Sequence, residues 1–403
     1  MKLIIRPLKR EDNKEEIFEL CKQNALKSAV YATNYDVWNF QYVNNPLKKS
    51  WNSVLVNKED NAIHGHMGLV PQIIKLGSFD LLAGTLGNGV INTSVRNKLL
   101  PFNKSKTFAI TPLIDRCVND SFNDNVDLCL VNSIIHPLIW RTLKFRTTNV
   151  EQKVTFHSSL RGLFKAYLEL FRNIFKTSFI RFFALPYSIF LIIIQLITKI
   201  IRKFSSVSNE IKKGNLVINK IFQFTEDFDH FFNEFYDANP ELITYKRDLN
   251  FLNWRFKSNH FLIYSFKVKN KLIGYIILKK QDDCKNENNH IVMDCIILND
   301  YLSYTSSIFK RLSKVENLRI SFLHYLSCNY THRLFKQCLK QGVLFTLNPL
   351  RILGVDKKKG HITSTLYYKI NDKSKIAEEQ KEFFDQTNNW FITPILFHPS
   401  YYP

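Results

Sequence analysis

The feature that most constrains the fold is an uncharged stretch in the middle of the chain, from Phe182 to Thr198. Basic residues stand directly on both sides of it, at Arg181 and Lys199. The stretch interrupts a chain of 403 residues with a formal net charge of +21, and it separates two halves whose predicted elements follow a similar order. We therefore expect two domains joined by an apolar connector.

The stretch reaches the lower limit for a membrane-spanning helix, which is roughly 17 residues. Pro186 and Gln195 weaken that interpretation, because both are unfavourable in a continuous spanning helix. A single crossing would also place two paired domains on opposite sides of the bilayer. We therefore favour a buried or interfacial helix, and a cytoplasmic protein for which peripheral contact with the inner membrane face stays open.

The charge balance favours anionic partners, since 56 Lys and Arg oppose 35 Asp and Glu. Cofactor phosphates, nucleic acid and anionic lipid all satisfy this condition. The crowding of basic residues beside the apolar stretch favours lipid, and we do not expect nucleic acid as a partner. The seven cysteines form no CxxC pair, so we expect reduced thiols and no metal.

Apolar periodicity in the first half predicts a mixture of strands and helices. Helices are expected over Glu11–Ser28 and from about Ser105 to Cys117. Separate strands are expected at the N-terminus and over Ser53–Val56, His64–Val70, Ile73–Leu76, Gly89–Val95 and Val126–Val131.

The second half repeats this mixture after a polar linker. Helices are expected over Phe222–Phe235 and Ser303–Val315. Strands are expected over Phe261–Val268, Leu272–Leu278, Ile291–Leu298, Leu318–Leu323 and Leu366–Ile370. The domain boundaries that follow are a first domain over 1–160, a connector over 161–214, a second domain over 215–375 and a tail over 376–403.

Several short segments, together with the order of the predicted helices and strands, resemble the GNAT superfamily of acyl-CoA-dependent acyltransferases. The most specific is Arg247–Phe256, which is similar to an "RDxxYLxWRY" segment of that family. Gly274-Tyr275-Ile276 is similar to its "GYxVL", and Asp294 to an acidic residue near the end of the next strand. Trp38–Pro46 resembles a "WxxxYxxNP" patch in the first half. The resemblance implies an α+β fold with mixed sheets, in two tandem GNAT-like domains joined by the apolar segment.

The family binds the cofactor pyrophosphate at a glycine-rich loop between a strand and a helix. The corresponding stretch here, Arg96–Thr107, is basic but contains no glycine, and an ordinary basic surface loop is the alternative interpretation. The stretch in the second half, Asn299–Thr305, has neither glycine nor basic residues. By resemblance, the residues expected to bind acyl-CoA are Val95, Arg96, Lys104, Ser105, Lys106, Thr107 and Asn132.

Acyl transfer to an amine uses a base, and imidazole titrates in the right range. His64 and His66 flank Gly65 on a predicted strand and are the candidate catalytic residues. Alternation places both on one strand face, so they are ordinary surface residues if that face is solvated.

The expected function is therefore an acyltransferase that moves an acetyl or other acyl group from a CoA thioester to an amine. By analogy with tandem members among bacterial surface-polysaccharide functions, the acceptor is an amine-bearing small molecule, an amino sugar or a glycan precursor. Two alternatives stay open at this level. One is a non-catalytic scaffold in surface-polysaccharide assembly, which the missing glycines favour. The other is a tRNA-dependent aminoacyltransferase, which the positive charge would suit.

Overall fold

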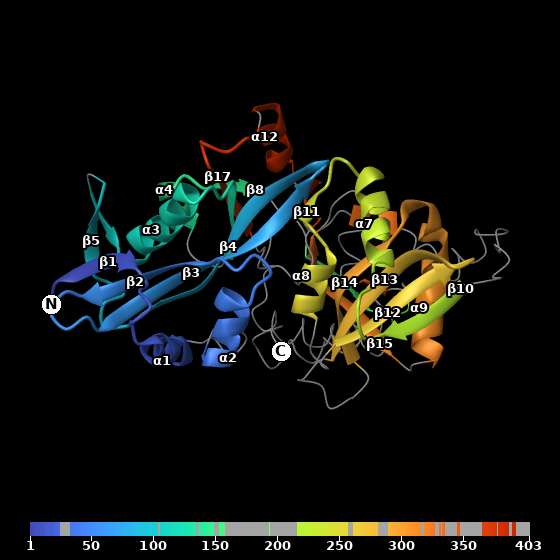
Figure 1. The fold of residues 1–403 in the computed structure, drawn as a ribbon, viewed down its shortest axis with the longest axis horizontal. Helices are drawn as coiled ribbons and strands as arrows, with labels where there is room; N and C mark the ends of the chain where they lie inside the picture. The colour runs from blue at the N-terminus through green and yellow to red at the C-terminus, as the bar shows by residue number, and fades with distance from the viewer. Residues whose placement is uncertain are drawn as a thin grey trace.

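The structure is a computed structural model, and it combines helices with two mixed β-sheets that lie side by side (Figure 1). This confirms the predicted mixture of α and β elements. The residues it describes are 1–24, 33–103, 105–133, 137–148, 153–157, 193, 216–256, 261–280, 289–315, 318–326, 330–331, 333–334, 345–346, 365–376, 378–386 and 389–391.

The first sheet has eight strands and mixes parallel with antiparallel pairs. Its order is β1 (Leu3–Pro7), β2 (Trp51–Asn57), β3 (Ile63–Leu76), β4 (Phe79–Ile91), β7 (Leu128–Ser133), β17 (Thr365–Ile370) and β8 (Arg146–Thr148), with β11 (Ile243–Tyr245) attached to β3.

Helices cover both faces of the first sheet (Figure 1). α3 (Ile110–Asn123) and α4 (Pro137–Thr142) pack on one face, where α3 buries Leu113, Ile114 and Cys117. α1 (Lys14–Asn24), α2 (Tyr35–Trp38) and the π-helix η1 (Asn39–Val43) pack on the other face. Each face therefore has its own apolar core, as expected for a sheet buried on both sides.

The second sheet has seven strands. Its order is β10 (Leu216–Ile221), β12 (Phe261–Val268), β13 (Lys271–Lys280), β14 (Asn289–Ile297), β15 (Arg319–Leu326), β9 (Lys153–His157) and β16 (Phe345–Thr346). The helices whose bounds the structure describes in this part of the chain are α7 (Asp227–Asp237), α8 (Leu249–Arg255), the 3₁₀ helix η2 (Asn299–Tyr304), α9 (Thr305–Val315) and α12 (Glu378–Asp385).

α7 is held on the second sheet by aromatic side chains. Phe228, Phe231 and Phe232 recur at helical spacing, and each places its ring within 6 Å of the Tyr275 ring on β13. The edge-to-face geometry of these contacts is the one that aromatic quadrupoles prefer.

Each sheet contains at least one strand from the other half of the chain, and in the first sheet β11 of the second half already pairs with β3. β17, near the C-terminus, lies between β7 and β8 of the first sheet. β9, which precedes the connector, lies between β15 and β16 of the second sheet. The expected ranges 1–160 and 215–375 thus each include a strand that pairs outside its own range, and the two sheets are tied together by backbone hydrogen bonds.

Two local expectations were wrong. The strands expected as separate pieces are one long hairpin, because β3 runs unbroken through Pro71 and β4 through Gly84. β2 pairs with β3 only as far as Leu69, so Pro71 lies where β3 has β4 as its strand partner, and a missing N–H is tolerated there. The helix expected from Ser105 begins instead at Ile110, after a hairpin of β5 (Leu99–Phe102) and β6 (Ser105–Phe108).

The apolar stretch Phe182–Thr198 and the rest of the expected connector lie outside the described residues, apart from Ile193. Within the described part of the chain, no helix is both long enough and apolar enough to cross a bilayer.

The strand exchange predicts that the first sheet requires the end of the chain. Ending the chain after residue 364 removes three side chains that β17 buries, Leu366, Tyr367 and Tyr368. Each buried side chain of this kind stabilises by about 1.5–3 kcal/mol, and folded domains have only about 5–15 kcal/mol in total. We expect the shortened chain to lose cooperative thermal unfolding. A chain ending at Phe391 is the control, because it keeps these contacts; equal unfolding of the two chains would contradict the prediction.

Candidate functional site

Strands β4 and β7, in the middle of the first sheet, run parallel and then separate. Their last pair is Thr85 opposite Leu130. β4 continues to Ile91 and β7 to Ser133, with no further pairing between them among the residues described. Beyond Thr85, backbone groups on this side of β4 therefore have no strand partner in the described part of the chain and can bind an extended ligand.

A β-bulge lies on β4 where the two strands separate. The register against β3 shifts next to the pair Gly68–Gly87, and Asn88 has a left-handed φ of 53°. A Cβ atom placed on Gly87 would meet no atom of the described residues within 4 Å, so these residues leave the space beside it open. Bulges and strand glycines often mark a place where a ligand approaches the backbone closely.

The π-helix η1 brings two polar side chains onto this bulge. The side-chain amide of Asn88 donates hydrogen bonds to Gln41 Oε1 and to the Tyr42 hydroxyl, both at 2.6 Å. The Tyr42 hydroxyl lies directly against Gly68, where any Cβ would clash with it. Gln41 is only 1% exposed, yet its Nε2 has no hydrogen-bond partner within the described chain. A short π-helix and an orphaned buried amide are both typical of functional sites.

His66, one of the two predicted catalytic residues, is part of the same cluster. It is fully buried, with Nδ1 3.1 Å from the Asn88 carbonyl oxygen and Nε2 3.0 Å from the Asn52 side-chain amide. Burial lowers the pKa of His66 to about 4, although the hydrogen bond to Asn88 opposes that shift. The imidazole is thus neutral near pH 7, and both of its nitrogens face polar partners. His64 is half-buried on the same strand.

The residues expected to contact the cofactor phosphates lie at both ends of the β5–β6 hairpin. Buried Val95 and exposed Arg96 follow β4, while exposed Ser105 and Lys106 and half-buried Thr107 lie on β6. The pair Leu99–Phe108 closes the base of the hairpin just before α3, whereas Ser105 pairs with Phe102 beside the turn, so Ser105 and Lys106 lie at the end of the hairpin away from Arg96.

Two further expected residues are less fully described. Asn132 lies on β7, where its backbone pairs with Leu366 of β17. Lys104 lies outside the described residues. Among the residues described, no group of three or more His, Cys, Asp or Glu side chains could hold a metal ion.

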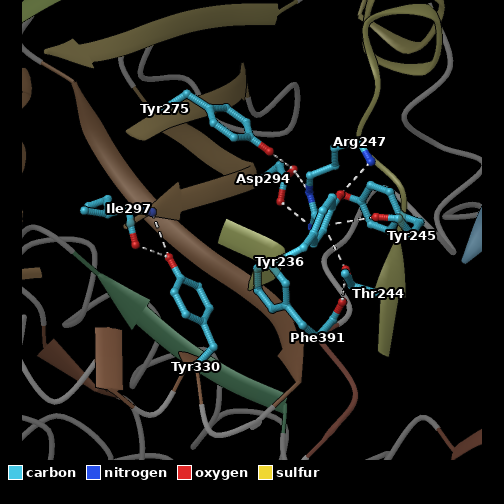
Figure 2. A network of polar contacts seen from close by, with 9 residues as sticks. All are labelled: Tyr236, Thr244, Tyr245, Arg247, Tyr275, Asp294, Ile297, Tyr330 and Phe391. Carbon is cyan, nitrogen blue, oxygen red and sulfur yellow. Dashed lines mark hydrogen bonds and ion pairs between the residues drawn. The ribbon is translucent and has the colours of Figure 1, made fainter. Parts of the chain in front are cut away.

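The second sheet also has a pair of parallel strands that separate, but different side chains occupy the space between them. β14 pairs with β15 as far as Ile291 opposite Ser321, and Asp294 follows Ile291 by the same three residues that separate Asn88 from Thr85. Asp294 is fully buried and receives two hydrogen bonds from Arg247, at 2.8 and 3.2 Å, and one from the Tyr275 hydroxyl (Figure 2).

The same network satisfies the rest of the Arg247 side chain. Its Nη1 donates to Thr244 Oγ1 at 2.8 Å and to the Tyr245 carbonyl oxygen at 3.2 Å, and its guanidinium lies 4.0 Å from the Tyr245 ring centroid. Burial alone disfavours the charge, yet the Asp294 carboxylate raises the pKa of Arg247 above its ordinary value. Arg247 and Asp294, which the sequence analysis singled out, thus form a buried ion pair whose contacts lie within the protein.

Tyr330 occupies the edge of β14 in this second opening. Its hydroxyl donates to the Ile297 carbonyl oxygen at 2.9 Å and accepts from the Ile297 N–H at 2.7 Å (Figure 2). The backbone groups that an extended ligand would use at this position of β14 are therefore already bonded to a side chain of the protein.

Comparison with known proteins supports this architecture. Three solved structures each match 92% of the chain: a GCN5-related N-acetyltransferase from Anabaena variabilis (TM-score 0.55, 8% identity, 73% of that chain), a probable N-acyltransferase from Enterococcus faecalis (0.50, 8%, 73%) and a GCN5-related N-acetyltransferase from Kribbella flavida (0.50, 7%, 72%). The chain has the fold of the GCN5-related N-acetyltransferases. No family model and no curated protein sequence matches it.

The sequence named His66 and the stretch before α3 as candidates, but it did not name Gly87, Asn88 or Gln41, which the structure places beside His66. One signal for the missed residues was available, because the glycine-rich run Gly84–Gly89 stands inside an otherwise apolar strand pattern. Glycines in that position predict a bulge or a close backbone contact. Nothing in the local sequence around Gln41 indicates a π-helix.

The buried imidazole predicts a pH dependence of stability. The unfolded chain binds a proton on His66 at the ordinary pKa of about 6.5, whereas the folded chain binds it only near 4. The contribution of neutral His66 to the free energy of unfolding is complete above pH 6.5. It is lost as the pH falls towards 4, and the loss is on the order of 3 kcal/mol. His66→Gln should flatten this part of the curve in urea unfolding between pH 4 and 7. An unchanged slope would show that His66 does not cause it.

The buried ion pair of the second sheet predicts a large effect of one isosteric change. Asp294→Asn leaves the Arg247 charge buried without its counter-ion, which typically costs about 3–5 kcal/mol. Asp227→Asn is the matched control, because its ion pair with Lys267 is exposed and should contribute little. Urea unfolding of both variants tests the difference, and similar midpoints would contradict it.

Proposed function

We propose that the chain is an acyltransferase that uses an acyl-CoA at the first sheet and transfers its acyl group to an amine. The observation that carries this proposal is the contrast between the two pairs of separating strands. In the first sheet, the β4 edge beyond Thr85 has no strand partner among the described residues, and Gly87 borders space that none of them fills. In the second sheet, Tyr330 fills the corresponding edge. One acyl-CoA per chain is therefore the expected stoichiometry, with the two sheets as two copies of the fold.

The thioester end of the co-substrate would lie at the β4 bulge, and the phosphates near the β5–β6 hairpin. Arg96, Ser105, Lys106 and Thr107 are the described residues proposed to contact the phosphates, because they lie between the end of β4 and the start of α3. The N-terminus of α3 follows this stretch and has no side-chain cap, so the positive end of its helix dipole adds to the attraction for an anion.

The chemistry requires few protein groups. The amine nitrogen attacks the thioester carbonyl carbon, a C–N bond forms, the C–S bond breaks, and the thiolate takes up the proton that the amine loses. We propose that Tyr42 relays this proton: its hydroxyl protonates the thiolate and regains a proton from the attacking amine, since it stands over Gly68 beside the open position at Gly87. His66 and Asn88 would act as positioning residues, because they hold Tyr42 and the bulge in place. His64 stays a candidate base.

An amino sugar or glycan precursor is the acceptor that we propose, following the resemblance to surface-polysaccharide proteins. The net charge of +21 supports a second proposal, contact with an anionic membrane surface.

Calorimetry with acetyl-CoA tests the proposed function. We expect one equivalent to bind per chain, and Gly87→Leu to weaken binding by tenfold or more, because the new side chain enters the open space. The unfolding midpoint should stay unchanged, since no atom of the described chain lies within 4 Å of the new Cβ. Phe222→Ala is the control, as Phe222 is 87% exposed and belongs to the second half of the chain. The absence of binding heat at millimolar acetyl-CoA would contradict the proposal and favour the scaffold.

A further inference from the structure

Helix α8, from the second half of the chain, lies against η1 and forms one wall of the candidate site in the first half. The Phe40 ring on η1 stacks on the Trp254 ring of α8, with centroids 4.7 Å apart and planes 13° from parallel. Figure 1 shows α8 beside α2, the helix that leads into η1. Both rings are only half-buried, so the stack borders solvent.

Backbone pairing fixes this wall over the hairpin of β3 and β4. β11 pairs with β3 from Leu76 to Ile74, and the Lys246 N–H donates to the Ile73 carbonyl oxygen at 2.7 Å. The chain then turns into α8, so α8 bridges from this end of β3 to Phe40 on η1. Lys246 and Lys75 both form ion pairs with Asp80 on β4, at 2.7 and 2.9 Å. These ion pairs also hold β11 against the hairpin.

The floor between these walls is polar but carries no charge. Gln72 on β3 donates to Thr85 on β4 at 2.5 Å, and both residues are half-buried, as is Val70. Gly87, with open space beside it, continues the floor towards the bulge. These residues lie between the apolar cluster that contains Trp38 and Tyr42 and the one that contains Ile74 and Ile243, so this face of the hairpin reaches from one half of the chain to the other.

Two N–H groups on the walls have no partner within the described chain, namely Gln41 Nε2 and Trp254 Nε1. A cation lies next to the stack, since the Arg255 Cζ is 5.9 Å from the Trp254 ring centroid. The described groove residues therefore offer hydrogen-bond donors and ring faces, and they include no carboxylate that would hold an ammonium ion.

An acceptor amine must have a free electron pair to attack a thioester. A strongly basic alkyl amine is almost wholly protonated at neutral pH and would need a carboxylate or another base to release its proton. A 2-amino sugar is less basic, because its neighbouring hydroxyls withdraw electron density, so a larger fraction is neutral. Its ring also has an apolar face for aromatic stacking and oxygens that accept hydrogen bonds.

We infer that the groove between η1 and α8 is an acceptor site shared by both halves of the chain, with Trp254 as a specificity-determining residue, and that it selects a low-basicity amine on a neutral, hydroxyl-bearing ring. This inference rests on the proposed acyl transfer for its chemistry, but binding of the acceptor can be measured without the co-substrate.

The test uses glucosamine as the probe and cyclohexylamine as a six-membered ring with a strongly basic amine. Saturation-transfer NMR without acetyl-CoA should show that glucosamine binds to the wild-type protein, and more tightly than cyclohexylamine does. Trp254→Phe keeps the stack with Phe40 but removes the N–H, and should weaken glucosamine binding about five- to tenfold. Trp254→Ala should weaken it further, and Phe222→Ala should leave it unchanged.

Calorimetry on the same variants should show an unchanged acetyl-CoA affinity. The inference is overturned if glucosamine does not bind, if cyclohexylamine binds more tightly, or if both Trp254 variants bind glucosamine like the wild type. If glucosamine binding depends on Trp254 while acetyl-CoA does not bind at all, the proposed function fails and the shared groove stands.

Discussion

Backbone hydrogen bonding between β17 and β7 holds the whole arrangement together. β7 is the strand that separates from β4, and β17 supports its other edge along the full pairing from Thr365 to Ile370. Asn371 continues this contact, donating to the Asp127 carbonyl oxygen at 2.8 Å. The candidate site therefore depends on residues that are more than two hundred positions away in sequence. Contacts of this separation close late in folding, because the loop-closure entropy must be overcome first.

The two pairs of separating strands show how one backbone geometry supports different roles. At the position three residues beyond the last parallel pair, the first sheet has Asn88 and the second has Asp294. Asp294 forms a fully buried ion pair with Arg247. Removing either partner would therefore leave a buried charge without its counter-ion. Asn88 is neutral, lies beside open space and contacts a buried amide with a free donor. The first arrangement can exchange partners with a ligand at low cost, whereas the second cannot.

Local sequence patterns predicted the elements whose partners are close in the chain. The hairpin of β12 and β13 was expected over Phe261–Val268 and Leu272–Leu278, and it forms over Phe261–Val268 and Lys271–Lys280. The helix expected over Ser303–Val315 is present as η2 and α9. The strand Leu366–Ile370 was also predicted, but not that it joins the first sheet. Periodicity reports which face of an element is buried, and it contains no information on which distant strand is its neighbour.

The sequence by itself determined the mixed α and β composition, the basic character and the residues His66, Arg247 and Asp294 as positions of interest. Only the tertiary structure decided what those residues do. Burial makes His66 a neutral member of a polar cluster, and a guanidinium brought from 47 residues away turns Asp294 into half of an ion pair. The shared groove was likewise beyond sequence reasoning, since it exists only because β11 pairs with β3 and brings Trp254 to Phe40. Electrostatics and stacking depend on distance in space, which a linear pattern does not contain.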